Sequence, residues 1–214
     1  RATSIETEGK ANGSVKSHMN ITLGAFNPGS GEENNAVNSY RTAAKILTDP
    51  FVSRVNIVAI PGIRDSFVTD FTADKVREYS KALYLMDIPA YGDDTTTRIY
   101  DNSSKRANVI NTIELFENRA IDNNYVATYF PDVIKEDRVN LEAVNMPASI
   151  AAIGALAYND SVAFPWFAPA GFNRGALTDV LNTEIRLNSE DRNILYEARI
   201  NPIANFPNGG FVIM

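Results

Sequence analysis

Residues 55–60, Val-Asn-Ile-Val-Ala-Ile, place the strongest restriction on how this chain can fold. The run is almost continuously apolar and rich in β-branched residues, without the alternation of a strand that has one face in water. Such a strand is covered on both faces, as in a parallel sheet with helices on either side. We therefore expect an α/β architecture around this segment, with the strand ending at Pro61-Gly62.

The other elements expected along the chain alternate between helices and strands. Helices are expected from a cap at Asn38-Ser39 to near Asp49, from Thr72 to Leu83, from a cap at Ser103-Ser104 through Phe116, from Pro147 to about Tyr158, and from Ser189 through Ala198. Strands are expected at residues 19–23, 83–88, 125–130 and 211–214. This order, with short connections, predicts a layered α/β sandwich with a mostly parallel sheet flanked by helices, plus additional mixed elements.

Several segments between these elements are expected to be irregular. On the first helix, the residues expected to face inward are Tyr40, Ala43, Ala44 and Leu47. Residues 89–104 and the charged residues 135–141 are expected to form loops, residues 176–181 a short helix or turn, and residues 201–210 a turn that leads into the last strand.

Residues 164–175, Phe-Pro-Trp-Phe-Ala-Pro-Ala-Gly-Phe-Asn-Arg-Gly, predict an anchored loop of defined shape that buries its own aromatic rings. Its prolines stiffen the backbone and its glycines free it. We expect Trp166, Phe167 and Phe172 to anchor a core or an interface rather than to line a ligand pocket. Arg174 is expected to bind loop carbonyls or a neighbouring subunit, the alternative being a grip on a carboxylate or phosphate.

Composition narrows the possible chemistry. The 214 residues are 44% hydrophobic, and 20 Lys and Arg against 26 Asp and Glu, interspersed along the chain, give a net charge of −6. An acidic chain without a basic face argues against nucleic acid as the main partner. No apolar run approaches the roughly 20 residues that cross a bilayer. The chain has no cysteine thiol and a single imidazole, His18, which we interpret as a solvated surface residue.

No catalytic constellation is visible. The only Gly-Lys pair, Gly9-Lys10, lacks the flanking residues of a phosphate loop, and no G-x-S-x-G elbow is present. A glycosidase needs only two carboxylates, but the only acids near the aromatic loop are Asp160 and Asp179. Asp93-Asp94 could bind a hard cation, although a solvated turn is the preferred interpretation. We therefore expect no catalytic residue, no cofactor and no metal site.

Six segments carry a family resemblance: Asn-Ile-Thr-Leu-Gly at 20–24, Leu-Thr-Asp at 47–49, Val-Asn-Ile-Val-Ala-Ile-Pro-Gly at 55–62, Tyr-Phe-Pro at 129–131, Trp-Phe-Ala-Pro-Ala-Gly at 166–171 and Asn-Pro-Ile-Ala-Asn-Phe-Pro at 201–207. In this order they resemble the middle of a contractile phage tail sheath protein. The resemblance spans about residues 20–214, and its last two motifs are the most specific. It departs at residues 26–31, where the family often has a Gly-Gly-x-Asp-Gly turn, so no role of that turn is carried over.

The resemblance implies a structural subunit and no enzyme. Sheath subunits polymerise around a tail tube and contract to drive the tube through the host envelope. The implied partners are other copies of the chain, the tail tube protein, and baseplate and tail terminator proteins, with no direct nucleic-acid contact and no membrane insertion. The implied location is the virion tail, after assembly in the host cytoplasm. The alternative is an α/β ligand-binding module or an uncharacterised hydrolase domain.

The domain organisation follows from composition and from the same resemblance. Residues 1–19 are polar and without apolar periodicity, so they are expected to be a flexible lead-in or the margin of a preceding domain. Residues 20–214 are expected to be a sheath-type α/β core, truncated at its C-terminal end. The chain begins at Arg1 and ends on an apolar run at Met214, so we expect an internal fragment of a longer polypeptide.

Overall fold

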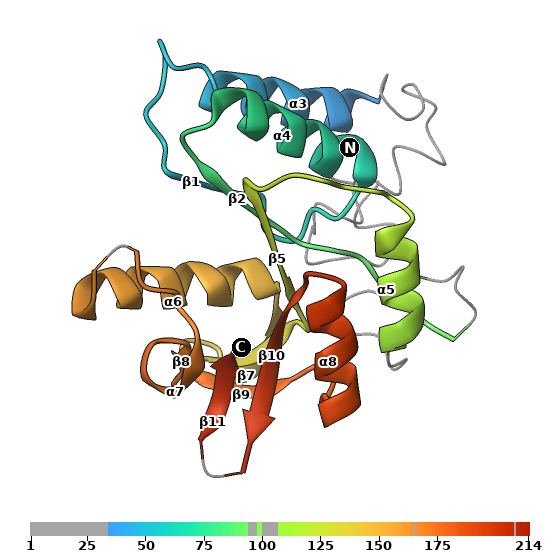
Figure 1. Ribbon diagram of the computed structural model, residues 1–214, viewed down its shortest axis with the longest axis vertical. Coiled ribbons are helices and arrows are strands. Elements are labelled where there is room, and N and C mark those ends of the chain that lie inside the picture. Colours follow the sequence, from blue (N-terminus) through green and yellow to red (C-terminus); the bar gives the residue numbers. More distant parts are fainter. Residues whose placement is uncertain (1–33, 94–97, 100–106, 165, 208) are drawn as a thin grey trace. The chain divides into compact units, whose positions relative to one another are not determined.

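The computed structural model describes residues 34–93, 98–99, 107–164, 166–207 and 209–214 (Figure 1). These residues belong to two compact units, the first within Arg1–Met86 and Asp122–Val126, the second within Asp87–Ile121 and Ala127–Met214. The expected lead-in with His18, the strand at 19–23 and the cap at 103–104 lie outside the described residues, as does Asp94.

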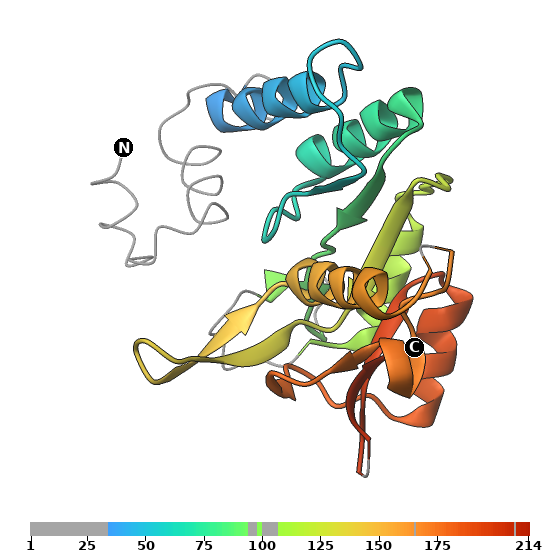
Figure 2. The ribbon, with the colours of Figure 1, turned by 90° about the vertical axis from the view of Figure 1, so that its left-hand side faces the viewer.

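The first unit places two helices beside a small parallel sheet. Its elements are α3 (Asn35–Leu47), β1 (Ile57–Ala59), α4 (Ser66–Tyr79) and β2 (Leu83–Met86). β1 and β2 are parallel, with Val58 opposite Tyr84, and the Tyr84 amide donates to the Tyr125 carbonyl at 2.8 Å. Figures 1 and 2 both show α3 (blue) alongside α4 (green). Val37, Ile63 and Val68 lie in the core between these elements, each at most 1% exposed.

Both helices of the first unit begin earlier than expected. The Asn34 side chain accepts a hydrogen bond from the Ala36 amide, and Asp65 accepts one from the Phe67 amide, each at 2.9 Å. Asn and Asp in extended backbone cap a helix as well as Ser or Thr does. Thr72, expected to open the second helix, lies inside α4 and donates its hydroxyl to the Val68 carbonyl at 2.8 Å.

The covered strand of this unit is β2 rather than β1. Parallel pairing of the run at 55–60 is confirmed, but Ile57 remains 41% exposed, and only Val58 of β1 is buried. In β2, by contrast, Tyr84, Leu85 and Met86 are each at most 1% exposed. The inward face expected for α3 is also partly wrong, because Ala36, Val37 and Ala44 are buried while Ala43 and Leu47 are exposed.

Among its described residues, the second unit contains part of a mixed sheet, a three-stranded antiparallel sheet, the two-stranded antiparallel sheet of β3 and β4, and four helices. The helices are α5 (Val109–Glu117), α6 (Ala148–Val162), α7 (Gly171–Arg174) and α8 (Ser189–Glu197). The strands are β3 (Ala90–Tyr91), β4 (Arg98–Ile99), β5 (Val126–Phe130), β6 (Val133–Asp137), β7 (Glu142–Met146), β8 (Ala176–Leu177), β9 (Val180–Thr183), β10 (Asn201–Phe206) and β11 (Gly210–Ile213).

The larger sheet of this unit combines parallel and antiparallel pairs. β5, which begins in the first unit, pairs parallel with β10. β10 pairs antiparallel with β11, and β11 with β8. In the smaller sheet β6 lies between β7 and β9, both antiparallel to it. The expected α/β class, with a mostly parallel sheet, helices and additional mixed elements, is confirmed.

Four segments expected to be irregular contain strands. Residues 135–137 belong to β6, while 138–141 form the turn of the hairpin with β7. The expected loop at 89–104 contains β3 and β4, residues 176–181 contain β8 and the start of β9, and residues 201–206 form β10. The hairpin is drawn in yellow in Figure 2. The sequence did not predict this hairpin because its strands are charged and lack an apolar pattern, and an exposed hairpin depends on backbone pairing instead. It did not predict β10 because Pro202 indicated a turn. Proline is nevertheless compatible with extended backbone, and the Pro202 carbonyl accepts from the Met214 amide at 3.0 Å.

Candidate interaction surface

The helix α6 leads into the aromatic loop, and two aspartates hold its first turn. Pro147 caps α6 without a side-chain hydrogen bond. Instead, Asp87 accepts from the Ser149 amide through Oδ1 at 3.0 Å and from the Ser149 hydroxyl through Oδ2 at 2.8 Å. Asp132 accepts from the Ala148 amide at 3.3 Å. Carboxylates at a helix N-terminus satisfy unpaired amides and interact favourably with the helix dipole.

The aromatic rings at the end of α6 stack on one another at the surface. Phe164 and Trp166 have ring centroids 4.8 Å apart and are parallel to within 1°, and Phe167 lies 6.2 Å from Phe164. Their exposed fractions are 59% for Phe164, 76% for Trp166 and 41% for Phe167. We call these three residues the aromatic patch. The expectation that the loop buries its own rings is therefore wrong, and an anchor in the core is excluded for Trp166.

Polar contacts fix the backbone beneath the aromatic patch. The Arg174 Nε atom donates to the Ala168 carbonyl at 3.1 Å, and its guanidinium lies 4.8 Å from the centroid of the Phe167 ring. Asn159 of α6 donates its Nδ2 to the Phe167 carbonyl at 3.0 Å. The expected binding of a loop carbonyl by Arg174 is confirmed. These contacts hold the rings in place although water reaches them, which is how a preorganised contact surface is built.

Phe172, from the same loop, does not belong to the aromatic patch and packs against Phe206 of β10 instead. Its ring lies edge-on to Phe206 at 5.1 Å, and it is 57% exposed. With Pro207 and Gly209 these two rings line an open depression of about 630 Å³. The loop therefore has two exposed apolar surfaces, the aromatic patch and the depression beside Phe172. The sequence predicted one set of anchoring rings and did not separate these two.

Two of the three described acidic residues weighed as candidates, Asp93 and Asp179, have structural partners. Asp179 forms an ion pair with Lys135, and this hydrogen bond holds the pKa of the Asp179 carboxyl below its usual value. Asp93 accepts from Asn108, the cap of α5, at 2.9 Å. Asp160 lies exposed on α6. Among the residues with described positions, no three His, Cys, Asp or Glu side chains gather as metal ligands would. None of the described helices has the length and apolar character to cross a membrane.

Comparison with known proteins shows to which protein family the chain belongs. Residues 41–214 match the family described as phage tail sheath protein central domain. The chain belongs to the phage tail sheath family. The sheath resemblance carried by its motifs is thereby confirmed, and the members of this family are structural proteins of phage tails.

Two phage tail sheath proteins match part of this sheath chain. The tail sheath protein of Vibrio phage KVP40 is 37% identical over 93 residues, and that of Enterobacteria phage T4 is 31% identical over 94 residues. Each match covers 44% of this chain and 13% of the relative. The matched part is thus a small fraction of these relatives' length.

Solved sheath structures share the fold at low sequence identity. The helical sheath of the anti-feeding prophage in its contracted state matches with a TM-score of 0.56 and 18% identity, over 86% of this chain and 43% of that chain. The contracted sheath complex of an extracellular contractile injection system, PVC, matches with a TM-score of 0.52 and 19% identity, over 94% of this chain and 52% of that one. The sheath chain therefore spans about half the length of these structures.

Proposed function

We propose that this chain is part of a sheath subunit that polymerises around a tail tube and contracts to drive the tube through the host envelope. The observation that supports this most is the family match over residues 41–214. The proposed partners are other copies of the chain, the tail tube protein, and baseplate and tail terminator proteins. The proposed location is the virion tail, reached after assembly in the host cytoplasm. The proposed role is structural, without catalysis, nucleic-acid binding or membrane insertion.

We also propose the domain organisation that the sequence and the sheath resemblance predict. Residues 20–214 would form the sheath-type core, and residues 1–19 would be either a lead-in or the margin of a preceding domain. Two compact units suit a motor part, because rigid bodies can exchange contacts while their interiors stay unchanged. Shifting one two-state unit from 1:99 to 99:1 takes about 5.5 kcal/mol of differential stability. Coupled around a ring of subunits, a modest gain for each copy makes contraction effectively irreversible.

The aromatic patch supports a role in contacts between proteins. Exposed rings that cluster rather than scatter mark interaction sites, since each one costs free energy in water. Tyr, Trp and Arg are also the residues that dominate binding energy at interfaces. The patch combines Trp166 with two Phe rings, and Arg174 lies against one of them, Phe167. We propose that it is buried against another subunit in the assembled sheath.

Removal of the aromatic patch tests this role. In the natural full-length polypeptide, the double substitution Phe164→Ala with Trp166→Ala is expected to raise the concentration needed for assembly by at least about tenfold, because losing two interface rings costs about 2 kcal/mol or more. Sedimentation of the assembled fraction measures this. The melting temperature should change by no more than about 2 °C, because both rings are more than half exposed.

Tyr196→Ala provides the matched control. Tyr196 lies on α8, is 78% exposed and forms no ring contact with the patch. Its removal also deletes an exposed aromatic ring, so it should leave sedimentation unchanged. If the folded double variant assembles at the concentration of the unmodified polypeptide, the aromatic patch has no part in assembly.

A further inference from the structure

The turn at the end of the β6–β7 hairpin presents two apolar side chains to water. We call residues 138–141, which connect the two strands, the hairpin tip. Within the hairpin tip, Val139 is 89% exposed and Leu141 is 78% exposed. Figure 2 shows the hairpin (yellow) projecting from the rest of the second unit. Because apolar groups are unfavourable in water, a contact that covers both side chains is stabilising.

Hydrogen bonds to Asp137 fix the shape of the hairpin tip. The Asp137 Oδ1 atom accepts from the Val139 amide at 2.9 Å, Oδ2 accepts from Asn140 Nδ2 at 2.7 Å, and the backbone carbonyl accepts from the Leu141 amide at 2.7 Å. The first two bonds hold the pKa of the Asp137 carboxyl below its usual value, so it stays charged at neutral pH. The hairpin tip is therefore preorganised, and little conformational freedom is lost when a partner covers it.

Leu141 has a backbone conformation that leucine rarely adopts. Its φ angle is 55°, in the left-handed region, where glycine is unstrained and a residue with a Cβ atom is not. Burial of the leucine side chain does not offset this strain, because the side chain lies mostly in water. A strained residue that holds an apolar side chain in water indicates a contact made outside its own chain.

The depression lined by Phe172, Phe206, Pro207 and Gly209 can receive such a side chain. We call this depression, of about 630 Å³, the Phe172 depression. The Phe172 ring lies edge-on to Phe206 and so close to Gly209 that a Cβ atom there would overlap it, so the depression is already formed in the unbound chain. The four lining residues carry no polar side-chain atom, whereas small-molecule sites use polar groups to orient their ligands. An apolar side chain of a protein is the better match.

One cation and one carboxylate beside these surfaces provide a second match. The Arg192 guanidinium carbon lies 5.0 Å from the centroid of the Phe206 ring, at the border of the Phe172 depression. Glu142, the first residue of β7, is exposed and directly follows Leu141. Neither Arg192 nor Glu142 forms an ion pair with another residue in the described ranges. Each therefore has its charge available for a partner of opposite sign.

Both surfaces belong to the second unit, yet they do not meet within one copy. Leu141 is exposed and the Phe172 depression is open, so a contact between them joins two copies. We propose that the hairpin tip of one copy docks in the Phe172 depression of a neighbouring copy, with Glu142 beside Arg192. Such a contact is heterologous and propagates from copy to copy as a ring or helix. It rests on the proposed sheath function and names one of the contacts that hold the sheath together.

A double-mutant cycle tests whether Leu141 and Phe172 meet. In the natural full-length polypeptide, Leu141→Gly and Phe172→Ala are each expected to raise the concentration needed for assembly about tenfold. Both remove the same contact, so the variant carrying both should also need about tenfold more, instead of the roughly hundredfold that independent sites would give. Sedimentation of the assembled fraction measures these concentrations. Independent, multiplying effects would overturn the docking contact, as would single variants that assemble like the unmodified polypeptide.

Leu141→Gly also separates docking from folding. Glycine relieves the strained φ angle, so the unassembled variant should melt within about 2 °C of the unmodified polypeptide or above it, although its assembly is weakened. A leucine that served only the fold would lower the melting temperature when removed, and that result would contradict the docking role. Ala120→Gly is the matched control. Ala120 has a φ angle of 49° and follows α5, outside both surfaces, so the same relief of strain should leave assembly unchanged.

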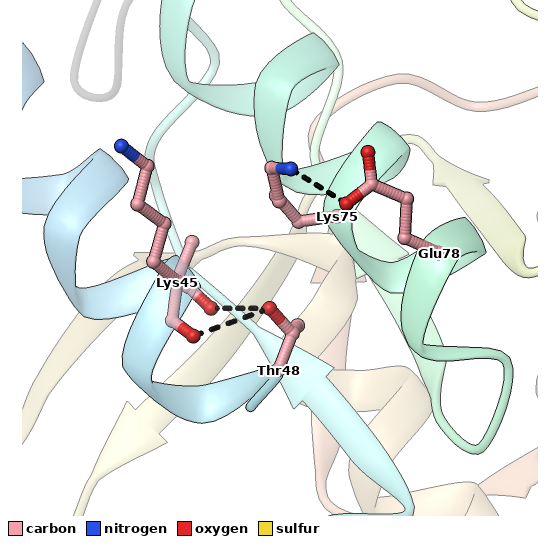
Figure 3. A network of polar contacts seen from close by, with 5 residues as sticks. Lys45, Thr48, Lys75 and Glu78 are labelled. Carbon is pink, nitrogen blue, oxygen red and sulfur yellow. Dashed lines mark hydrogen bonds and ion pairs between the residues drawn. The ribbon is translucent and has the colours of Figure 1, made fainter. Parts of the chain in front are cut away.

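Charge reversal tests the pairing of Glu142 with Arg192. Glu142→Lys and Arg192→Glu are each expected to raise the concentration needed for assembly about fivefold, and the variant carrying both should return to within about twofold of the unmodified polypeptide. Glu78→Lys is the control, because it makes the same charge change on α4 of the first unit. There Glu78 forms a surface ion pair with Lys75 at 2.6 Å (Figure 3), and its loss should leave assembly unchanged.

The outcomes distinguish this contact from the proposed function. If the double reversal assembles as poorly as the single ones, Glu142 does not meet Arg192 and the proposed docking is wrong. Cylinders that form equally well with all of these variants would reject the docking contact alone. If the unmodified polypeptide forms no cylinders at all, the proposed function itself fails.

Discussion

Asp87→Ala is expected to lower the free energy of unfolding of the second unit by about 3 kcal/mol. Asp87 is 3% exposed and receives both hydrogen bonds that Ser149 donates at the start of α6. Alanine would leave the Ser149 amide and hydroxyl buried without this acceptor, since Ser149 is itself only 1% exposed. It would also remove negative charge from a helix N-terminus. Urea denaturation followed by circular dichroism measures the loss.

Asp49→Ala is the matched control for Asp87→Ala. The Asp49 side chain also accepts a backbone hydrogen bond, from the Phe51 amide at 2.9 Å, but this bond is exposed to water. Water can replace the lost acceptor there, so the control should cost less than about 1 kcal/mol. If Asp87→Ala costs no more than this control, the buried pair is not what anchors α6.

Gly175→Ala is expected to destabilise the second unit by about 2–3 kcal/mol, because it overpacks a backbone contact. A Cβ atom on Gly175 would lie 2.8 Å from the Ala170 Cα and 2.8 Å from the Ile213 carbonyl oxygen. Both are backbone atoms, so no side chain can rotate away to make room. The Gly175 carbonyl also accepts from the Ile213 amide at 2.8 Å, which ties the end of the loop to β11. The midpoint of thermal unfolding would report the change.

Gly154→Ala separates steric overlap from the general effect of replacing glycine. Gly154 lies inside α6, and nothing stands within 4 Å of its added Cβ. Alanine at a helix interior position is favourable by about 0.5–1 kcal/mol relative to glycine, so this variant should be more stable than the unmodified chain. An unchanged melting temperature for Gly175→Ala would show that the loop shifts without cost, and would remove the argument for its rigid attachment to β11.

The sequence predicts elements best where local pattern and local chemistry agree. β5, α6 and α8 lie close to their expected positions, and Asn188 caps α8 one residue before the expected Ser189. The starts of α3 and α4 were misplaced because each has several polar residues able to cap, and burial of residues such as Val37 and Val68 decides among them. That burial depends on which other elements pack against the helix, and the sequence of the helix does not contain this information.

The candidate interaction surface also shows that sequence predicts local contacts better than contacts between distant residues. The sequence identified the aromatic loop and the role of Arg174, since both rest on neighbours within about ten residues. It missed Asp87, whose partner Ser149 is 62 residues away in the sequence. Whether Trp166 is covered depends on another copy of the chain, so neither its own sequence nor its own fold answers that question.

Electron microscopy of the purified natural full-length polypeptide tests the proposed sheath role most directly. If the polypeptide is a sheath subunit, it should form hollow cylinders of stacked rings. Separate particles at every concentration and salt condition tried, or an intact tail whose outer cylinder lacks this polypeptide, would contradict the proposed role.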